Sequence, residues 1–157
     1  MKVSGSHEFQ LRLFRPADLK NILSIEHAAF PREPYDKELF LELYRDCGGL
    51  FIVAKFSGRI AGYMVSCAKS GKAEIVSIAV HPKYQELGVG SALMVHTLAA
   101  LKKKKSQSVK LMVRTTNSSG VRFYRRFGFT LVRRVPRYYE DGGDAFRMSL
   151  AKQRLSR

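Results

Sequence analysis

A glycine-rich turn between an apolar segment and a long helical segment constrains this chain most. Residues 85–90 read Gln-Glu-Leu-Gly-Val-Gly; they follow the apolar run 75–80 and precede an amphipathic segment that starts at Ser91. Two glycines two positions apart let the backbone pack tightly and expose its N–H groups. A helix start adds unpaired N–H donors and the positive end of the helix dipole. The arrangement predicts a strand, a turn and a helix that together bind a diphosphate.

Two common phosphate-binding motifs are excluded. The turn is not Gly-x-Gly-x-x-Gly, and no acidic residue ends a second strand about 20 positions later, as a dinucleotide-binding fold requires. No Gly-Lys-Ser/Thr follows, so the turn is not the phosphate loop of the nucleoside triphosphatases. Taken alone, the pattern Gln-x-x-Gly-x-Gly fits either a coenzyme-binding loop or a tight turn that caps a helix.

Two later segments decide between these alternatives. Residues 111–117 form an apolar run that ends in Asn117, a favourable helix N-cap, and the helix that follows bears Tyr124 and ends at Gly128. Residues 138–148 carry a Tyr-Tyr pair and then Asp-Gly-Gly-Asp-Ala. In this order, the segments resemble the GCN5-related N-acetyltransferases (GNAT). The last is similar to a hairpin of enzymes that acetylate protein N-termini, including archaeal and eukaryotic N-α-acetyltransferases and the bacterial ribosomal-protein alanine acetyltransferase.

Length and composition fit one domain with a single substantial core. We expect this domain to cover residues 1–157, with its core at about 9–150 and a basic tail at 151–157. No apolar run approaches the ~20 residues that span a bilayer, and no signal segment is recognisable, which predicts a cytoplasmic protein without a membrane partner. Cys47 and Cys67 match no metal-ligand spacing, so we expect two reduced structural thiols and no metal.

The positive charge is concentrated in the C-terminal third of the chain. The net charge is +15, of which residues 1–101 carry +2 and residues 102–157 carry +13. Such a field serves solubility, and it also attracts coenzyme A phosphates, acidic peptides or ribosomal RNA. Because no nucleic-acid-binding motif accompanies the charge, attraction of coenzyme A is the stronger expectation, and ribosome association through this basic part the weaker one.

The residue pattern predicts an α/β (α+β) chain, and the resemblance implies the GNAT fold. We expect a mixed, mostly antiparallel sheet of about seven strands flanked by about four helices. The expected strands are 8–14, 50–55, 60–68, 73–80, 109–115, 129–135 and 144–150. The expected helices are 16–29, 36–46, 88–104 and the short helix that bears Tyr124.

The resemblance implies that acetyl-coenzyme A is the co-substrate. Its pantetheine arm would lie along a splayed strand, its pyrophosphate would bind backbone N–H groups of the glycine-rich loop, and Gln85 would close that loop. Asn117 would bind the cofactor or a bridging water, or serve only as the helix N-cap. The cofactor-binding residues implied are Ile78, Ala79, Val80, Gln85, Glu86, Leu87, Gly88, Val89, Gly90, Ser91, Asn117 and Tyr124.

Proton transfer needs an acid and a base. Tyr124 is the candidate general acid, because a phenol with a pKa near 10 is protonated at neutral pH and can protonate a thiolate. Met112 stands where the bacterial ribosomal-protein enzyme carries a Glu on the strand before the Asn, so that assignment does not carry over. We rank Glu33 first as the catalytic base and Glu74 second.

Three tyrosines are expected to line the groove for the acceptor: Tyr35, Tyr138 and Tyr139. We expect transfer of an acetyl group to the α-amino group of a protein N-terminus by direct attack in a ternary complex. Acetylation of lysines or small amines by the same fold is one alternative. The other is a ribosome- or nucleic-acid-binding module in which the acetyltransferase site is vestigial, as Met112 and the basic C-terminal part suggest.

Overall fold

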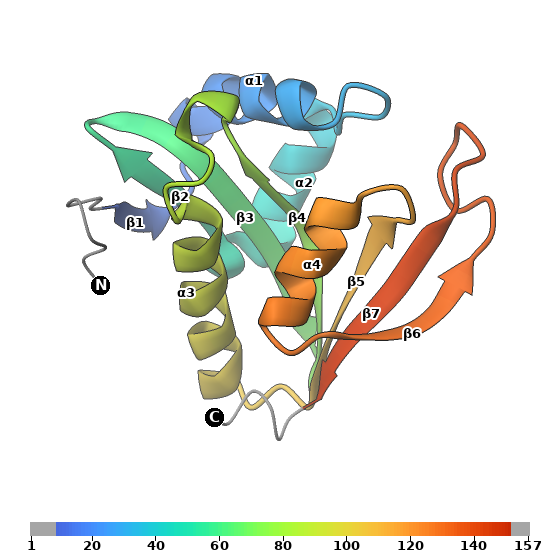
Figure 1. The fold of residues 1–157 in the computed structure, drawn as a ribbon. Coiled ribbons are helices and arrows are strands. Elements are labelled where there is room, and N and C mark those ends of the chain that lie inside the picture. The colour runs from blue at the N-terminus through green and yellow to red at the C-terminus, as the bar shows by residue number, and fades with distance from the viewer. Residues whose placement is uncertain (1–8, 152–157) are drawn as a thin grey trace.

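The computed structural model describes residues 9–151, which build a sheet of seven strands in the order β1-β2-β3-β4-β5-β7-β6 (Figure 1). The predicted mixed sheet is confirmed. Of the expected basic tail, only Ala151 belongs to the described residues. The strands are β1 (Gln10–Leu13), β2 (Phe51–Phe56), β3 (Arg59–Lys69), β4 (Lys72–Val80), β5 (Ser108–Arg114), β6 (Thr130–Val135) and β7 (Ala145–Ala151). The helices are α1 (Leu19–Ala29), α2 (Lys37–Cys47), α3 (Val89–Lys103) and α4 (Ser118–Arg126), with short 3-10 turns η1 (Pro16–Asp18), η2 (Gly48–Leu50) and η3 (Pro82–Tyr84).

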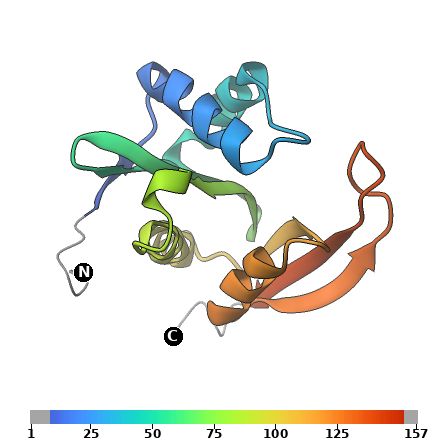
Figure 2. The same ribbon diagram turned by 45° about the horizontal axis from the view of Figure 1, so that its top comes forward.

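The helices cover both faces of the sheet. Figure 2 shows α1 and α2 on one face and α3 and α4 on the other. Each face has its own buried core: Ile22, Ile25 and Phe40 belong to the α1–α2 side, whereas Leu93 and Met94 belong to the α3 side. Because β2 and β3 are buried on both faces along most of their length, these strands between the cores are held rigidly.

Helix ends follow the sequence signals. The Asp36 side chain accepts a hydrogen bond from the N–H of Leu39 at 2.9 Å, which caps α2. Asn117 caps α4 through its Oδ1, which accepts from the N–H of Gly120 at 3.0 Å. Gly128, just past the end of α4, has a φ of +96°, the left-handed conformation in which glycine commonly ends a helix.

Strands β4 and β5 separate after a short parallel pairing. Only Lys72–Glu74 pair with Ser108–Lys110, whereas every other strand pair of the described sheet is antiparallel. Both strands continue beyond these pairs and diverge in a V (Figure 1). The far part of β4 therefore keeps backbone N–H and C=O groups that β5 does not bind, as the expected place for a pantetheine arm requires.

The expectation of two reduced thiols was wrong. Cys47 at the end of α2 and Cys67 on β3 form a disulfide, with Cα atoms 5.2 Å apart. The sequence separation of 20 residues gives no hint of this proximity. It arises because α2 packs on β3, which brings the two Cα atoms within the usual disulfide range of 4.4–6.8 Å.

Within residues 9–151, no helix is long and apolar enough to cross a membrane. In the same part of the chain, no group of three or more His, Cys, Asp or Glu side chains is placed to hold a metal ion.

Candidate active site

The glycine-rich loop runs from η3 into the first turn of α3. Gly88 has a φ of +89° and Glu86 a φ of +64°, so two left-handed residues turn the chain sharply ahead of the helix. The first helical hydrogen bond runs from the N–H of Ala92 to the carbonyl of Gly88 at 3.0 Å. The N–H groups of Val89, Gly90 and Ser91 therefore have no carbonyl one turn back in the helix, and they form the donor set that an anion needs.

The first turn of α3 packs closely against α4 at this loop. Gly90 faces α4: a Cβ placed there would lie 3.4 Å from Phe123 and 3.7 Å from Val80. The Gln85 side chain donates from Nε2 to the carbonyl of Val80 at 3.4 Å, so it connects the loop to the end of β4. Leu87 is half-buried and the Glu86 side chain is exposed, as expected for an acidic residue that does not contact the phosphate.

The strand expected to carry the pantetheine arm is β4. Its residues Ile78 and Val80 face the α3 core, and Ala79 faces the α1–α2 core. The pairing of β4 with β3 contains a bulge: Val65 pairs with Ser77 and Ser66 with Ile75, so Val76 is an extra residue. A bulge kinks a strand and redirects its side chains.

Tyr124 lies on α4, packed among Phe123 and Phe129 with ring centroids 5.5 and 6.0 Å away. Burial raises the pKa of its phenol, and Tyr139 adds to the shift. The hydroxyl is therefore a proton donor at every pH below its raised value. Asn117, at the start of the same helix, is exposed, and its carboxamide oxygen is engaged in the helix cap.

Tyr35 ends the loop between α1 and α2 and points back to the sheet. Its hydroxyl donates to the carbonyl of Val76, the bulge residue, at 3.4 Å. Burial raises the pKa of this phenol to about 12, with contributions from the charges of Glu26 and Glu74. Tyr35 therefore connects the loop directly to β4.

Tyr138 and Tyr139 lie in the loop between β6 and β7, where their rings meet edge to face at 4.9 Å. Tyr138 is 48% exposed, whereas Tyr139 is half-buried and its pKa is raised to about 12, mainly by burial. The charge of Glu74 contributes to the raised pKa of Tyr138. The structure thus brings together two tyrosines of the β6–β7 loop, Glu74 on β4 and Tyr35.

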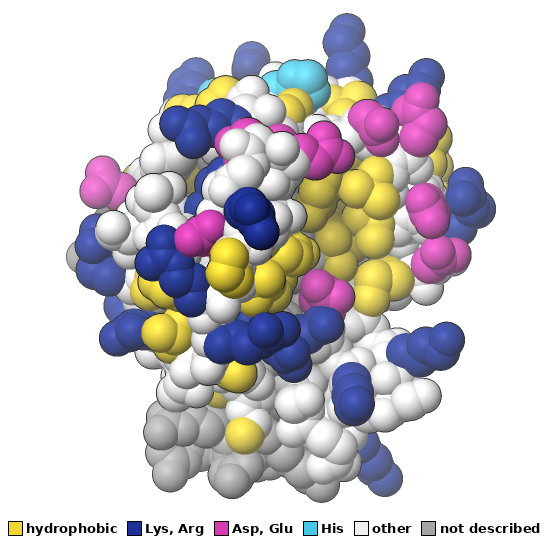
Figure 3. All heavy atoms as spheres, turned by 90° about the vertical axis from the view of Figure 1, so that its right-hand side faces the viewer, with side chains coloured by type: hydrophobic (Ala, Val, Ile, Leu, Met, Phe, Trp, Pro, Cys, Tyr) yellow, Lys and Arg dark blue, Asp and Glu magenta, His cyan; other side chains and the backbone are white. Residues whose placement is uncertain are grey.

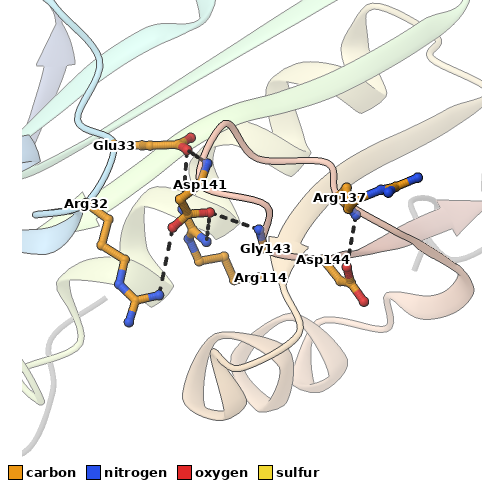
Figure 4. Close-up of polar contacts among 7 residues, drawn as sticks. All are labelled: Arg32, Glu33, Arg114, Arg137, Asp141, Gly143 and Asp144. Atoms are coloured by element: carbon orange, nitrogen blue, oxygen red, sulfur yellow. Dashed lines mark hydrogen bonds and ion pairs between the residues drawn. The ribbon is translucent and has the colours of Figure 1, made fainter.

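A group of charged side chains joins the α1–α2 loop to the β6–β7 loop, and we call Arg32, Glu33, Arg114 and Asp141 the loop latch. Figure 4 shows Glu33 and Asp141 facing each other across the two loops, with Arg114 beneath them. The N–H of Asp141 donates to Glu33 Oε1 at 2.8 Å, and Arg114 lies 3.1 Å from Asp141 and 3.8 Å from Glu33. Arg32 lies 3.8 Å from Asp141. These contacts hold together two segments 108 residues apart.

Further contacts shape the β6–β7 loop around the latch. The Arg114 guanidinium stacks 4.0 Å from the centroid of the Tyr139 ring. Asp141 accepts the N–H of Gly143 at 2.9 Å, and Arg114 and this N–H hold the pKa of Asp141 below its usual value. At the base of the loop, Asp144 accepts the N–H of Arg137 at 2.9 Å (Figure 4). The loop is therefore ordered by its own hydrogen bonds.

The two candidate bases have different surroundings. Glu33 is engaged in the loop latch. Glu74 is half-buried on β4, paired in register with Cys67 on one side and Lys110 on the other, at the last pair before β4 and β5 diverge. Among the described residues, its carboxylate forms no hydrogen bond or ion pair. Met112 lies on β5 opposite Arg147 of β7 and supplies no proton acceptor.

Three residues of this region received no role from the sequence: Arg114, Asp141 and Glu26. Arg114 carried a usable signal, since a charged residue that ends an apolar strand next to a helix N-cap often faces a site. Glu26 stands four residues after Ile22 on the apolar stripe of α1, where an acid is unusual. Asp141 had no signal beyond its place in the Tyr-Tyr segment.

On the side of the molecule that carries the β6–β7 loop, hydrophobic side chains line a hollow with acidic side chains on its rim (Figure 3). The charged side chains on the surface below it are mainly Lys and Arg. This face therefore combines an apolar floor with an acidic edge, which favours a ligand that is thin, partly apolar and positively charged.

Comparison with known proteins agrees with this geometry. The sequence of the chain is 33% identical over 154 residues to an N-alpha-acetyltransferase of Sulfolobus acidocaldarius, covering 90% of this chain and 91% of the relative. It is 32% identical over 97 residues to the [ribosomal protein bS18]-alanine N-acetyltransferase of Escherichia coli, covering 60% of this chain and 66% of that protein.

Solved structures are similar over nearly the whole fold. The crystal structure of Ard1 from Thermoplasma volcanium matches with a TM-score of 0.87 and 33% identity, covering 91% of this chain and 97% of that one. Naa20 of Chaetomium thermophilum in complex with a bisubstrate analogue matches with a TM-score of 0.84 and 28% identity, covering 94% and 88%. The family model that matches residues 17–129 is described as the acetyltransferase (GNAT) family. With this model spanning most of the chain and the splayed β4–β5 pair beside the glycine-rich loop, the chain belongs to the GNAT acetyltransferase family.

Proposed function

We propose that this protein transfers the acetyl group of acetyl-coenzyme A to the α-amino group of protein N-termini. The observation that carries the proposal is that Tyr35, Tyr138 and Glu74 lie together at β4: the Tyr35 hydroxyl donates to the carbonyl of Val76, and the charge of Glu74 acts on both phenols. Tyr139 stacks on Arg114 of the loop latch, and it also acts on the phenol of Tyr124. The names of the relatives from Sulfolobus and Escherichia support the same acceptor class.

The donor half fits a coenzyme A molecule. Its pyrophosphate binds backbone N–H groups of the loop, those of Glu86, Leu87, Gly88, Val89, Gly90 and Ser91. Gly88, with its left-handed backbone, and Gly90 place no side chain between these N–H groups and the phosphates. Bound there, the coenzyme supplies an acetyl thioester. Ile78, Ala79 and Val80 offer β4 backbone groups to its pantetheine arm.

The acceptor half fits a protein N-terminus. An α-amino group is a cation at neutral pH before it gives up its proton, since its unperturbed pKa is about 7.7–8.0. Acidic side chains on the rim of the hollow attract such a cation. Tyr35, Tyr138 and Tyr139 flank the path from the α1–α2 loop and the β6–β7 loop, and they restrict it to a thin chain end.

The proton balance of the reaction requires one base and one acid. We propose Glu74 as the first candidate for the base and Glu33 as the second, because the latch already engages Glu33 Oε1. This reverses the order that sequence alone suggested. Tyr124 gives its proton to the sulfur of the leaving thiolate. Attack is direct, because Cys47 and Cys67 form a disulfide and neither is free as a nucleophile.

Acetyl transfer to a panel of peptides tests this proposal. We expect activity on peptides with a free N-terminus and none on the same peptides with a blocked N-terminus and an internal lysine. Activity on the blocked peptides would favour the alternative acceptor class, lysines or small amines.

The base is assigned by comparing kcat and the peptide KM of Glu74→Gln and Glu33→Gln at one fixed pH. Loss of the true base lowers kcat by about 10²–10⁴-fold. Loss of the latch contact alone raises the peptide KM and leaves kcat unchanged. Full activity of Glu74→Gln would return the role to Glu33.

Ribosome association through the basic C-terminal part is a further part of the proposal. Exposed arginines on α4 and β6 support it, namely Arg122, Arg125, Arg126 and Arg133. Cosedimentation with ribosomes should weaken steeply between about 50 and 200 mM salt. Arg125→Glu/Arg126→Glu should abolish it, and Arg59→Glu/Lys83→Glu, on the opposite end of the fold, should not. Salt-sensitive RNA binding without any acetyl-coenzyme A binding would favour the binding-module alternative.

The proposal treats residues 1–157 as one acetyltransferase domain without a resident metal, working in the cytoplasm. The cytoplasmic location is supported by the class of acceptor, because ribosomal proteins and other newly made chains are acetylated at their N-termini there.

A further inference from the structure

Glu26 is a buried carboxylate that neither the donor site nor the loop latch uses. It lies on α1, its side chain is 1% exposed, and among residues 9–151 no cation forms an ion pair with it. A buried carboxylate is costly unless hydrogen bonds compensate for the lost water. The partners of Glu26 therefore indicate what holds it there.

Three donors from three different elements reach this carboxylate. The Tyr63 hydroxyl on β3 donates to Oε1, and the Ser77 hydroxyl on β4 lies 3.4 Å from the same oxygen. The N–H of Tyr35, at the end of the α1–α2 loop, donates to Oε2 at 2.9 Å. The hydroxyls of Tyr63 and Ser77 also lie within 3.1 Å of each other. The Glu26 side chain thus connects α1 with the α1–α2 loop and with strands β3 and β4.

The network meets β4 at its bulge. Ser77 directly follows the extra residue Val76, and the Tyr35 hydroxyl donates to the carbonyl of Val76. The bulge comes two residues after Glu74, the last residue of β4 that pairs with β5. Glu26 and Tyr35 therefore hold β4 at the point where it turns away from β5.

We propose that Glu26 is a positioning residue that fixes the bulge of β4 and the Tyr35 backbone in one arrangement. The acetyl thioester carried along β4 and the amine guided by the α1–α2 loop then meet at the right distance. Glu26 itself touches neither reacting group. The inference rests on the proposed function, in which β4 carries the donor and Tyr35 borders the acceptor path.

Two substitutions separate positioning from packing. In Glu26→Gln, the amide oxygen can accept the Tyr35 N–H, and the amide NH₂ can donate to the Tyr63 and Ser77 hydroxyls, which rotate to accept. In Glu26→Leu, the space stays filled and no buried charge remains, but all three hydrogen bonds are lost. Asp18→Asn is the matched control: Asp18 is a second buried carboxylate near the other end of α1, bound by Arg12 at 2.8 Å.

The readout is steady-state acetyl transfer at a temperature where every variant is fully folded by circular dichroism. We expect Glu26→Leu to lower kcat by about 10²-fold, the usual effect of a 1 Å misplacement, with the Kd for coenzyme A unchanged. Glu26→Gln should keep kcat within about threefold of the unaltered protein. Asp18→Asn should lower the unfolding temperature and leave kcat unchanged.

Two results would overturn the proposal: wild-type kcat in folded Glu26→Leu, or a Glu26→Gln variant as slow as Glu26→Leu. If Glu26→Leu does not fold, Tyr63→Phe removes one donor, keeps the buried ring, and should still lower kcat by about tenfold; wild-type kcat there would overturn the proposal equally.

Hydrogen–deuterium exchange keeps this test separate from that of the proposed function. Glu26→Leu should speed amide exchange in residues 33–36 and 76–78, and Glu26→Gln should not. If the unaltered protein acetylated no peptide, the proposed function would fail, and exchange would still decide whether Glu26 holds the bulge and the loop. Unchanged exchange in Glu26→Leu would contradict the positioning role.

Discussion

The glycine-rich loop and the two acceptor loops differ in how the sequence builds them. The glycine-rich loop consists of six consecutive residues that offer backbone N–H groups and the start of a helix. Its geometry depends on the φ angles of Glu86 and Gly88. The acceptor side that we propose is made of side chains on the α1–α2 loop and the β6–β7 loop, which are joined across 108 residues of sequence by the loop latch. A donor common to a whole family suits backbone recognition, whereas acceptors vary and suit exchangeable side chains.

Tyr124→Phe should have the largest effect, since it removes the proton for the leaving thiolate and keeps the ring that packs against Phe123 and Phe129. We expect kcat to fall by about 10²–10⁴-fold, measured at saturating peptide and acetyl-coenzyme A. Tyr44→Phe, an exposed tyrosine on α2, is the control. A kcat within a factor of about two of the unaltered protein would remove Tyr124 from the acid role.

Gly88→Val tests whether the donor is held by backbone geometry. A β-branched residue is strained at the φ of +89° and would reshape the loop, so the Kd for coenzyme A, measured by calorimetry, should rise by about 10²-fold. The control is Gly58→Val at the β2–β3 turn, where φ is +76° and a Cβ meets nothing within 4 Å. Gly58→Val should lower the free energy of unfolding by about as much as Gly88→Val does, but it should leave the Kd for coenzyme A unchanged. Equal losses of coenzyme A affinity in both variants would refute the prediction.

Asp141→Ala tests the acceptor side alone. Without the contacts of its carboxylate to Arg114 and Arg32, the tie between the two loops is reduced to the hydrogen bond from the N–H of residue 141 to Glu33 and to the Arg114–Glu33 ion pair. The peptide KM should rise by about tenfold, and the Kd for coenzyme A should not change. Glu140→Ala, its exposed neighbour, is the control. A loss of coenzyme A affinity in Asp141→Ala would show that the two sites are not built independently.

Acid should open the same latch. The pKa of Asp141 is lowered in the folded protein, so its contribution is present above the unfolded value of about 3.9 and is lost as the pH falls through the folded value. The affinity of the unaltered protein for the peptide, corrected for protonation of the acceptor amine with its pKa of about 7.7–8.0, should therefore stay constant from pH 8 down to about 5, because the latch does not change in this range.

Reduction of the Cys47–Cys67 bond should affect stability and neither site. The bridge closes a segment of 20 residues, for which chain entropy predicts a contribution of about 3 kcal/mol. Chemical denaturation of Cys47→Ser/Cys67→Ser should show this loss, while kcat and both binding constants stay unchanged at 25 °C. A changed peptide KM would mean that the bridge also positions Glu74, the register partner of Cys67.

High pH should have the smallest effect on activity. Burial raises the pKa of Tyr35 and Tyr139 to about 12, so both stay neutral when an unfolded tyrosine, with a pKa near 10, begins to ionise. Their contribution to stability is complete below pH 10 and is lost as the pH rises towards 12. Absorbance titration of the phenols should accordingly show no ionisation of these two below pH 10 in the folded protein.

The sequence predicts the features that consecutive residues build, and it does not predict the features that depend on contacts between distant segments. Strand and helix periods, the caps at Asp36 and Asn117 and the glycines at 88 and 128 are local signals, and they predicted the sheet and the strand, turn and helix around the glycine-rich loop nearly to the residue. The latch, the Cys47–Cys67 bond and the partners of Glu26 are contacts between distant segments. No local pattern encodes them, because they depend on how α1, α2 and the β6–β7 hairpin pack on the sheet.

The most direct test of the account is a competition within one molecule. A peptide with a free α-amino group and an internal lysine is incubated with the protein and acetyl-coenzyme A, and the acetyl group is located by tandem mass spectrometry. The account predicts acetylation of the α-amino group alone, because the tyrosine-flanked path between the two acceptor loops admits a chain end. Acetylation of the lysine, or none at either amine, would contradict it.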